Sequence, residues 1–137
     1  MRIYKTTDLF LIDEIHELDR KLFNDGSEFV ENVKIAGERH YWYVKDGQNV
    51  IAFAIADYDG EIVIGQRSGV LKPYRGNGLQ KRFIKRRHNL FSPSTHITYV
   101  HPQNPASLNS FISMAYKAYW PDYPWGGDGM VYLTKTV

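Results

Sequence analysis

Apolar residues recur at two different periods along the chain, and each period predicts a different kind of element. Near the N-terminus the steps are four, three and four residues, which is the spacing of one face of an amphipathic helix. Thr7 or Asp8 is expected to cap this helix, and residues 24–26 to end it. A second, weaker helix is expected from Ser27 toward Gly37. The apolar positions of the first helix are Leu11, Ile15, Leu18 and Leu22.

From residue 40 onward the pattern changes to short runs rich in aromatic and β-branched residues, which predict strands. Asp59-Gly60 predicts a two-residue type I′ hairpin turn between the second and third runs, because glycine accepts the positive φ that this turn requires. Gly65 and Gly69 are possible bulge positions in the third run. The predicted strands span residues 40–45, 50–58, 61–71, 97–100 and 130–136.

Two further helices are predicted between the later strands. Residues 79–91 form a basic amphipathic segment that Ser92-Pro93-Ser94 ends. Residues 104–119 form another helix, with a proline at an early position where it is tolerated. The order helix, helix, three antiparallel strands, helix, strand, helix, strand predicts a mixed α+β fold. No repeat or linker divides the chain, so one domain is expected.

Composition and charge narrow the possible functions. The chain has no cysteine, which excludes disulfides, thiolate metal sites and a cysteine nucleophile. No apolar run has the length of a signal peptide or a bilayer span, so the cytosol is the expected compartment and no membrane partner is expected. Residues 1–61 carry 7 basic and 13 acidic residues, whereas residues 62–121 carry 9 basic and no acidic residue. This separation indicates one end built for an anion and another that tolerates a cation, although an uneven solvated surface explains it equally well.

Arg75-Gly76-Asn77-Gly78 lies between a predicted strand and the basic helix, as in a pyrophosphate site. The first turn of a helix leaves amides without partners and carries partial positive charge, and glycine lets a ligand approach closely. Backbone donors from Gly76 to Gln80 could therefore surround one or two phosphates. The four residues also suit an ordinary turn, but 7 of the 17 basic residues fall in the sixteen positions from Lys72 to Arg87. Neither a nucleotide P-loop nor a dinucleotide fingerprint is present.

The segment from Val70 to Gln80 resembles the strand-to-helix segment of the GNAT superfamily of acyl-CoA-dependent N-acyltransferases. In that family a valine precedes a loop of the pattern Arg/Gln-x-x-Gly-x-Gly/Ala. Arg75 and Gly78 match this pattern, whereas Gln80 stands where glycine or alanine is usual. A larger residue there can still offer its backbone N–H, so the departure is compatible with phosphate binding.

A second segment resembles the same family in order and spacing. The family has a strand, an asparagine, a helix and a Gly-Phe pair in this order. This chain has residues 98–107, which include Asn104, followed at the family spacing by Phe111 and by Ala115-Tyr116. With the matching order of elements from Thr6 to Lys135, the resemblance covers nearly the whole chain. It implies a single N-acetyltransferase domain over residues 1–137, with a GNAT-like, mostly antiparallel sheet flanked by helices.

The resemblance also implies a site for acetyl-CoA as cosubstrate, without a metal. The sheet of such enzymes splays open between the fourth and fifth strands, here the strands ending at Leu71 and Val100. The pantetheine arm would lie in this gap and pair with the free strand edge, residues 68–71. The amide of Val70 or Leu71 would polarise the thioester carbonyl. The implied coenzyme A contacts are Val70, Leu71, Arg75, Gly76, Asn77, Gly78, Leu79, Gln80, Asn104, Ser107 and Phe111.

The proton transfers of such a reaction need a base and an acid. An ammonium of the lysine type has a pKa of about 10.4 and must lose its proton before it attacks. His101 follows the strand beside the splay and is the candidate catalytic base, with a loop histidine of no role as the alternative. The family's proton-donating tyrosine position holds Phe111, which cannot donate; Ser107, Tyr116 or Tyr119 could assist instead. The candidate carboxylate bases are Asp57, Asp59, Glu61, Asp122, Asp128 and those of the first two helices.

The acceptor is expected to be a cationic primary amine: a lysine, a protein N-terminus or a polyamine-like molecule. The resemblance places the acceptor site on the first two helices and the final hairpin, which are acidic and aromatic here, although the aromatic residues also suit hairpin packing. The oligomeric state is not predicted, and a homodimer is one of the alternatives. Two other functions compete: a catalytically weak acyl-CoA-binding protein, and a nucleic-acid-binding protein using the basic helix, which requires more assumptions. The acidic residues of the first two helices are Asp13, Glu14, Glu17, Asp19, Glu28 and Glu31, and the aromatic residues of the final hairpin are Tyr119, Trp120, Tyr123 and Trp125. The basic residues that would bind nucleic acid are Lys81, Arg82, Lys85, Arg86 and Arg87.

Overall fold

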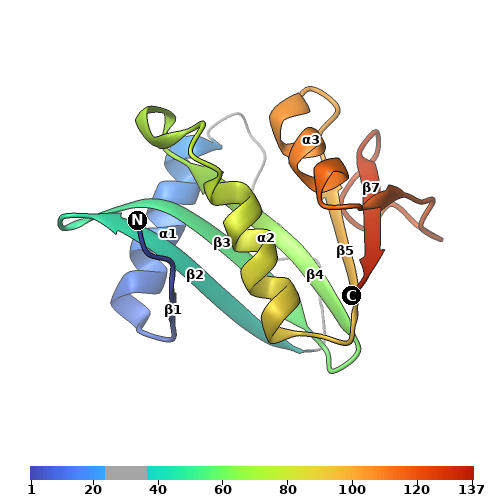
Figure 1. The fold of residues 1–137 in the computed structure, drawn as a ribbon, viewed down its shortest axis with the longest axis horizontal. Helices are drawn as coiled ribbons and strands as arrows, with labels where there is room; N and C mark the ends of the chain where they lie inside the picture. Colours follow the sequence, from blue (N-terminus) through green and yellow to red (C-terminus); the bar gives the residue numbers. More distant parts are fainter. Residues whose placement is uncertain (24–36) are drawn as a thin grey trace.

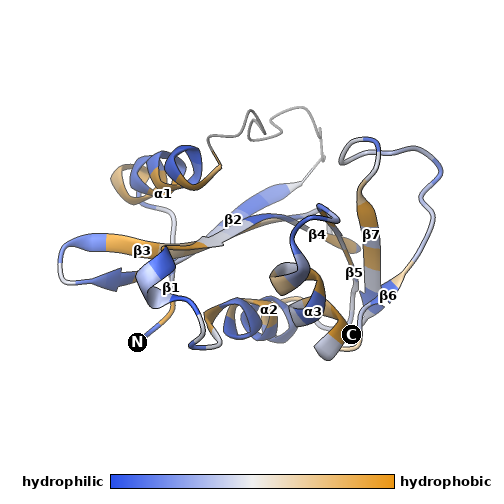
Figure 2. Cartoon of the chain, turned by 90° about the horizontal axis from the view of Figure 1, so that it is seen from above, coloured by the Kyte–Doolittle hydropathy of each residue, from blue (hydrophilic) through white to orange (hydrophobic). Residues whose placement is uncertain are grey.

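The computed structural model describes residues 1–23 and 37–137. The sheet has the strand order β1-β2-β3-β4-β5-β7-β6, and its neighbouring strands are antiparallel except for the parallel pair β4 and β5. Helix α1 covers one face of this sheet, and α2 and α3 cover the other (Figures 1 and 2). The expected α+β fold is thereby confirmed. The elements are β1 (Tyr4–Thr6), α1 (Leu9–Leu22), β2 (Glu38–Asp46), β3 (Asn49–Tyr58), β4 (Ile62–Val70), the 3₁₀ turn η1 (Lys72–Tyr74), α2 (Leu79–Leu90), β5 (Thr95–Val100), α3 (Pro105–Ser113), β6 (Lys117–Ala118) and β7 (Val131–Thr136).

Helix α1 forms as its apolar spacing predicts. The Asp8 side chain accepts a hydrogen bond from the Leu11 amide at 3.0 Å, which confirms the expected N-cap. Ile15 and Leu18 are buried against Phe53 and neighbouring apolar side chains of the sheet. The second predicted helix lies outside the described residues. Within the described part of the chain, no helix is long and apolar enough to cross a membrane.

The turn between β3 and β4 differs from the predicted one by one residue. The Asp59 amide donates to the Ile62 carbonyl at 3.3 Å, so Gly60 and Glu61 are the central pair. Gly60 has a φ of 97°, and Glu61 is not in the positive region, which fits a type II′ rather than a type I′ turn. The shift follows from the Asp59 carboxylate, which accepts from the Glu61 and Ile62 amides at 2.8 and 2.7 Å.

Strand β4 contains one bulge, and it lies one residue after Gly65, the first of the two predicted positions. Ile55 pairs with Arg67 but Ala56 pairs with Gly65, so Gln66 is the extra residue. Gly69 pairs regularly with Phe53 and is not a bulge. A bulge bends its strand and increases the local twist, and here it lies at the point where β4 leaves β5.

The expected splay between β4 and β5 is confirmed. The two strands pair only from Ile62 to Gly65, opposite Thr95 to Thr98. Beyond Gly65 the β5-facing edge of β4 has no partner strand among the described residues. Five residues of β4 therefore border an opening in the sheet.

The predicted helix over residues 104–119 is wrong beyond Ser113. Ala115 has a φ of 68°, and the amides of Ala115 and Tyr116 donate back to Ile112 and Phe111 at 3.0 and 3.1 Å. This is a Schellman cap with alanine where glycine is usual. Tyr116 becomes buried, and the next two residues form β6, which pairs with β7. The burial of Tyr116 thus outweighs the helical propensity of this segment.

Candidate functional site

The loop before α2 presents a row of unpaired amides. Gly76 and Gly78 have φ values of 85° and 75°, and Gly78 is the N-cap of α2. Arg82 is the first residue to donate into the helix, to the Gly78 carbonyl at 3.1 Å. Among the described residues, the amides from Gly76 to Lys81 therefore have no acceptor. With the helix dipole behind them, these amides form an anion-binding site.

Side chains of the loop fix its shape. Arg75 Nε donates to the Val70 carbonyl at 2.9 Å, and Asn77 Nδ2 donates to the Tyr74 carbonyl at 3.1 Å. The Tyr74 hydroxyl in turn donates to the Asp46 carboxylate. The side chains of Arg75 and Asn77 thus hold the loop against the end of β4, and the amides are left for a ligand.

A cavity of about 730 Å³ runs from this loop toward the splay. It joins the N-terminus of α2 to the first turn of α3. Leu71 and Asn77, both expected to contact coenzyme A, do not line it. The predicted contacts that line it are Val70, Arg75, Gly76, Gly78, Leu79, Gln80, Asn104 and Ser107.

A second cavity of about 330 Å³ adjoins the first inside the splay. The two share the side of β4 at Ser68 and the start of α3 at Asn104 and Ser107. His101 and Phe111 line the second cavity, as does Arg87, which sequence analysis did not place at this site. A ligand entering beside the loop could therefore reach the gap between β4 and β5.

The free edge of β4 offers amides at alternate residues. The Leu71 amide donates to the Ile51 carbonyl at 2.9 Å, so it is not available to a thioester. Because hydrogen-bonding direction alternates along an antiparallel strand, the amides of Ser68 and Val70 face the splay. The oxyanion-stabilising amide expected from Val70 or Leu71 can therefore come from Val70, or from Ser68 two residues earlier.

His101 and Asn104 lie in the turn that joins β5 to α3. Asn104 Oδ1 accepts from the Ser107 amide at 3.2 Å and caps α3. His101 Nδ1 accepts from the Gln103 amide at 3.0 Å, which fixes the neutral ring with its hydrogen on Nε2. As far as residues 1–23 and 37–137 are concerned, no carboxylate lines either cavity. His101 is thus the histidine among the described residues that line the two cavities.

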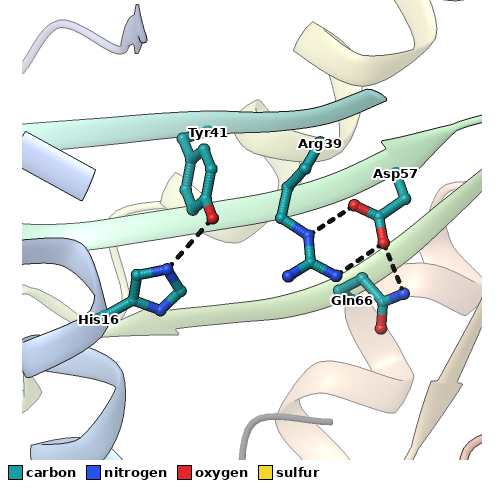
Figure 3. Close-up of polar contacts among 5 residues, drawn as sticks. All are labelled: His16, Arg39, Tyr41, Asp57 and Gln66. Atoms are coloured by element: carbon teal, nitrogen blue, oxygen red, sulfur yellow. Dashed lines mark hydrogen bonds and ion pairs between the residues drawn. The ribbon is translucent and has the colours of Figure 1, made fainter. Parts of the chain in front are cut away.

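Two carboxylates on the α1 face of the sheet are paired with arginines. Arg39 binds Asp57 through two hydrogen bonds of 2.7 and 2.9 Å, and Gln66 donates to the same carboxylate at 2.9 Å (Figure 3). The bond to Asp57 raises the pKa of Arg39. Arg67 Nε binds the buried Asp19 at 3.0 Å. Neither carboxylate is free to act as a base while these pairs are intact.

His16 lies beside this cluster, on the surface of α1 that faces the sheet. Its Nε2 contacts the Tyr41 hydroxyl at 3.1 Å (Figure 3). Burial lowers the pKa of His16, so the ring is held neutral at physiological pH. Figure 3 shows that this polar layer spans α1, β2, β3 and β4. These hydrogen bonds connect the neighbouring strands near the bulge at Gln66, where the splay begins.

The aromatic residues of the C-terminal segment divide into two groups. Trp125 Nε1 donates to the Tyr119 hydroxyl at 3.1 Å, and the Trp125 ring packs against Tyr99 at 5.3 Å. Trp120 and Tyr123 instead are 97% and 69% exposed. Packing therefore accounts for the first pair, and the second pair remains available to an acceptor.

The acidic residues of α1 divide in the same way. Glu14 accepts a hydrogen bond from the Val50 amide at 2.9 Å, and Asp19 binds Arg67 at 3.0 Å. Asp13 and Glu17 are exposed to solvent. Glu28 and Glu31 lie outside the described residues. No group of three or more His, Asp or Glu within the described chain could hold a metal ion.

Arg87 is the functional candidate that the sequence analysis missed. The sequence places it among the basic residues that would read phosphates in the nucleic-acid alternative, but the residue is only 4% exposed. The helical spacing contained the signal, since Leu79, Phe83 and Arg87 follow one another at steps of four and share the buried face. The spacing did not lead to a prediction that Arg87 is buried, because a charged arginine is rarely buried.

Comparison with known proteins identifies the fold. No protein-family model and no curated protein sequence matches the chain. Escherichia coli ElaA is 10% identical, over 98% of this chain and 99% of that one, with a TM-score of 0.76. Arabidopsis thaliana NAA60, solved in complex with acetyl-CoA, is 17% identical over 99% of both chains, with a TM-score of 0.72. The GNAT domain of S. lividans PAT is 13% identical, over 99% of this chain and 90% of that one, with a TM-score of 0.71. The chain therefore has the GNAT fold.

Proposed function

We propose that this protein is an acyl-CoA-dependent N-acyltransferase that moves the acetyl group of acetyl-CoA to a primary amine. The observation that carries the proposal is the row of amides from Gly76 to Lys81, which opens on a cavity that continues into the splay. Anion-binding amides at one end and a gap with free strand amides at the other suit a diphosphate joined to an extended amide-containing arm.

Different residues of the site bind different parts of acetyl-CoA. The amides from Gly76 to Gln80 hold the pyrophosphate, and the pantetheine arm lies along the edge of β4. The amide of Val70 or Ser68 polarises the thioester carbonyl, a contact whose loss from an oxyanion site typically costs about 3 kcal/mol of barrier. The acyl end occupies the second cavity, beside Ser107 and Phe111. The likeness to NAA60 solved with acetyl-CoA supports this donor.

Binding of coenzyme A tests the proposal directly. Isothermal titration calorimetry is expected to detect both coenzyme A and acetyl-CoA. At a hundred times its dissociation constant the ligand should raise the free energy of unfolding by about 2.7 kcal/mol. Absence of any interaction with either would contradict the proposal. Salt-dependent binding of DNA or RNA instead would favour the nucleic-acid alternative, for which the buried Arg87 is already unavailable.

Release of free thiol separates an enzyme from a protein that only binds acyl-CoA. We propose a cationic acceptor because Asp13 and Glu17 of α1 are exposed, and because Trp120 and Tyr123 offer exposed aromatic faces. A panel of lysine peptides, N-terminal peptides and polyamines, compared with neutral and anionic amines, tests the acceptor class. Preference for an anionic or a neutral amine would rule out a cationic acceptor.

Replacing His101 with glutamine is expected to lower kcat by about a hundredfold, the lower end of general-base contributions. We propose that His101 takes the amine proton, because no described carboxylate lines the cavities. Protonation at Nδ1 would release the Gln103 amide. Coenzyme A affinity should stay unchanged, because the ring is replaced by a neutral polar side chain away from the loop amides. A variant with the wild-type kcat would show that the base lies elsewhere.

A further inference from the structure

Arg87 is a buried cation without a carboxylate partner in the described part of the chain. Its Nε has no hydrogen-bond partner among the described residues. The Tyr116 hydroxyl and the face of Phe111 are among its neighbours, and the Phe111 ring centroid is 5.8 Å from Cζ. The arginines on the opposite face of the sheet are different, because Arg39 and Arg67 each bind an aspartate. Burying an unpaired charge destabilises a fold, so the position of Arg87 calls for a functional explanation.

The guanidinium lies at the apex of the splay. A Cβ built on Gly65 would stand 2.6 Å from Arg87 Nη1, so the absence of a side chain at Gly65 makes room for it. Gly65 is the last residue of β4 that pairs with β5. Arg87 lines the second cavity together with Ser107 and Phe111. On the proposed function, on which this inference rests, that cavity receives the thioester.

The tyrosines near this cavity in the described part of the chain are not suited to protonate the departing sulfur, and the family's tyrosine position holds Phe111. Phe111 has no acidic hydrogen, and the Tyr116 hydroxyl contacts His88 at 2.8 Å and does not line the cavity. Tyr99 does line it, but burial raises the pKa of this phenol above its ordinary value of 10.0. A thiol of the cysteine type has a pKa of about 8.5, so proton transfer from Tyr99 to the thiolate would be uphill.

We infer that Arg87 is a catalytic residue that stabilises the coenzyme A thiolate as the carbon–sulfur bond breaks. The amine nitrogen attacks the thioester carbonyl carbon, and a carbon–nitrogen bond forms. The tetrahedral intermediate then collapses, and the electron pair of the carbon–sulfur bond stays on sulfur beside the guanidinium. The ammonium proton passes to the base, and the thiolate takes a proton from solvent after it leaves.

The chemistry of arginine suits this role. Burial lowers the pKa of Arg87, yet arginine keeps its charge better than any other side chain. His88 and Tyr116 lie next to it, and both rings stay uncharged at neutral pH because burial lowers the pKa of His88 and raises that of Tyr116. The positive charge is thus left for a ligand. An opposite charge within 4–6 Å shifts a pKa by about one to three units.

Titration of the bound coenzyme A thiol tests the inference without turnover. The thiolate absorbs in the ultraviolet, and the complex with desulfo-coenzyme A serves as the reference that cancels protein absorbance. We expect the thiol pKa in the wild-type complex to lie about one to three units below that of free coenzyme A. Arg87→Met should abolish this shift, and Arg87→Lys should retain part of it. Arg86→Met removes the same charge from the exposed neighbour and should leave the shift unchanged.

In the Arg87→Met variant, the thermal stability should increase and the rate of acetyl transfer should decrease. Arg87→Met replaces an unpaired charge with an apolar side chain of similar length, so Tm is expected to rise by several degrees. The same variant should lower kcat by about a hundredfold. Equal thiol pKa values in the wild-type and Arg87→Met complexes would overturn the inference. If Arg87→Met does not fold, the role is structural unless Arg87→Lys still shows a lowered thiol pKa. Failure of the wild-type protein to bind coenzyme A would refute the proposed function instead.

Discussion

Between pH 7 and pH 4 the free energy of unfolding is expected to fall by about 6 kcal/mol, because two buried histidines must be protonated. Burial of the ring, with smaller contributions from neighbouring positive charges, lowers the pKa of both His88 and His96 from 6.5 to about 4. The unfolded chain takes up these protons near pH 6.5, and the folded protein only near pH 4. The contribution is therefore fully present above pH 6.5 and is lost as the pH falls toward 4. Each histidine accounts for about 3 kcal/mol at 1.36 kcal/mol per pKa unit.

Urea unfolding at a series of pH values measures this loss. His96→Leu is the informative variant, because neither ring nitrogen of His96 has a hydrogen-bond partner among the described residues. The variant should lose about half as much stability on acidification as the wild-type protein. His101→Gln, at an exposed position, should lose as much as the wild type. If His96→Leu and the wild type lose equal stability, the explanation by buried histidines is wrong.

Replacing Gly78 with valine is expected to weaken coenzyme A binding by about a thousandfold. Gly78 has a φ of 75°, a region in which a β-branched residue is strained. The loop would leave this conformation and turn the amides of Leu79 and Gln80 away from the phosphates. A hydrogen bond to a charged group contributes about 1.5–3 kcal/mol, so losing two costs about 4 kcal/mol. Isothermal titration calorimetry measures the affinity.

Gly60→Val is the matched control for the loop variant. Gly60 also has a positive φ, 97°, and at both glycines an added Cβ would meet nothing within 4 Å. It lies at the opposite end of β4, in the hairpin that precedes the strand. The control should lose about 1–2 kcal/mol of stability through the same kind of strain, with coenzyme A affinity unchanged. Similar affinities for both variants would show that the loop amides do not hold the ligand.

The sequence predicted those elements whose signals are local. The four-residue and three-residue steps of α1 and the apolar runs of the strands need no distant partner to be recognised. The pair Gly76 and Gly78 before a helix likewise predicted the row of free amides. The hairpin after β3 was misplaced by one residue, because the Asp59 side chain competes for the same backbone amides. The hairpin itself was predicted correctly, but the position of its turn depended on the hydrogen bonds of the Asp59 side chain.

The end of α3 could not be predicted in the same way. The local pattern around Ala115 is that of a helix, because alanine is the strongest helix former and stands here where the resembled family has glycine. The structure nevertheless places it at a φ of 68° and buries Tyr116 beside His88 and Phe111. The contact with His88 joins residues 28 positions apart. A local pattern cannot contain such a contact, so the predicted helix ran on to residue 119.

The amino-acid sequence by itself determined the α+β fold, the splayed sheet through its resemblance, and the anion-binding loop, because periodicity, turn residues and glycine spacing are properties of adjacent positions. Only the tertiary structure decided which groups face the splay. The Leu71 amide pairs with Ile51, and Asp57 and Asp19 pair with arginines. Arg87 is buried without a carboxylate partner among residues 1–23 and 37–137. These outcomes depend on which side chains meet across the sheet, since charge pairing and burial are set by neighbours in space rather than along the chain.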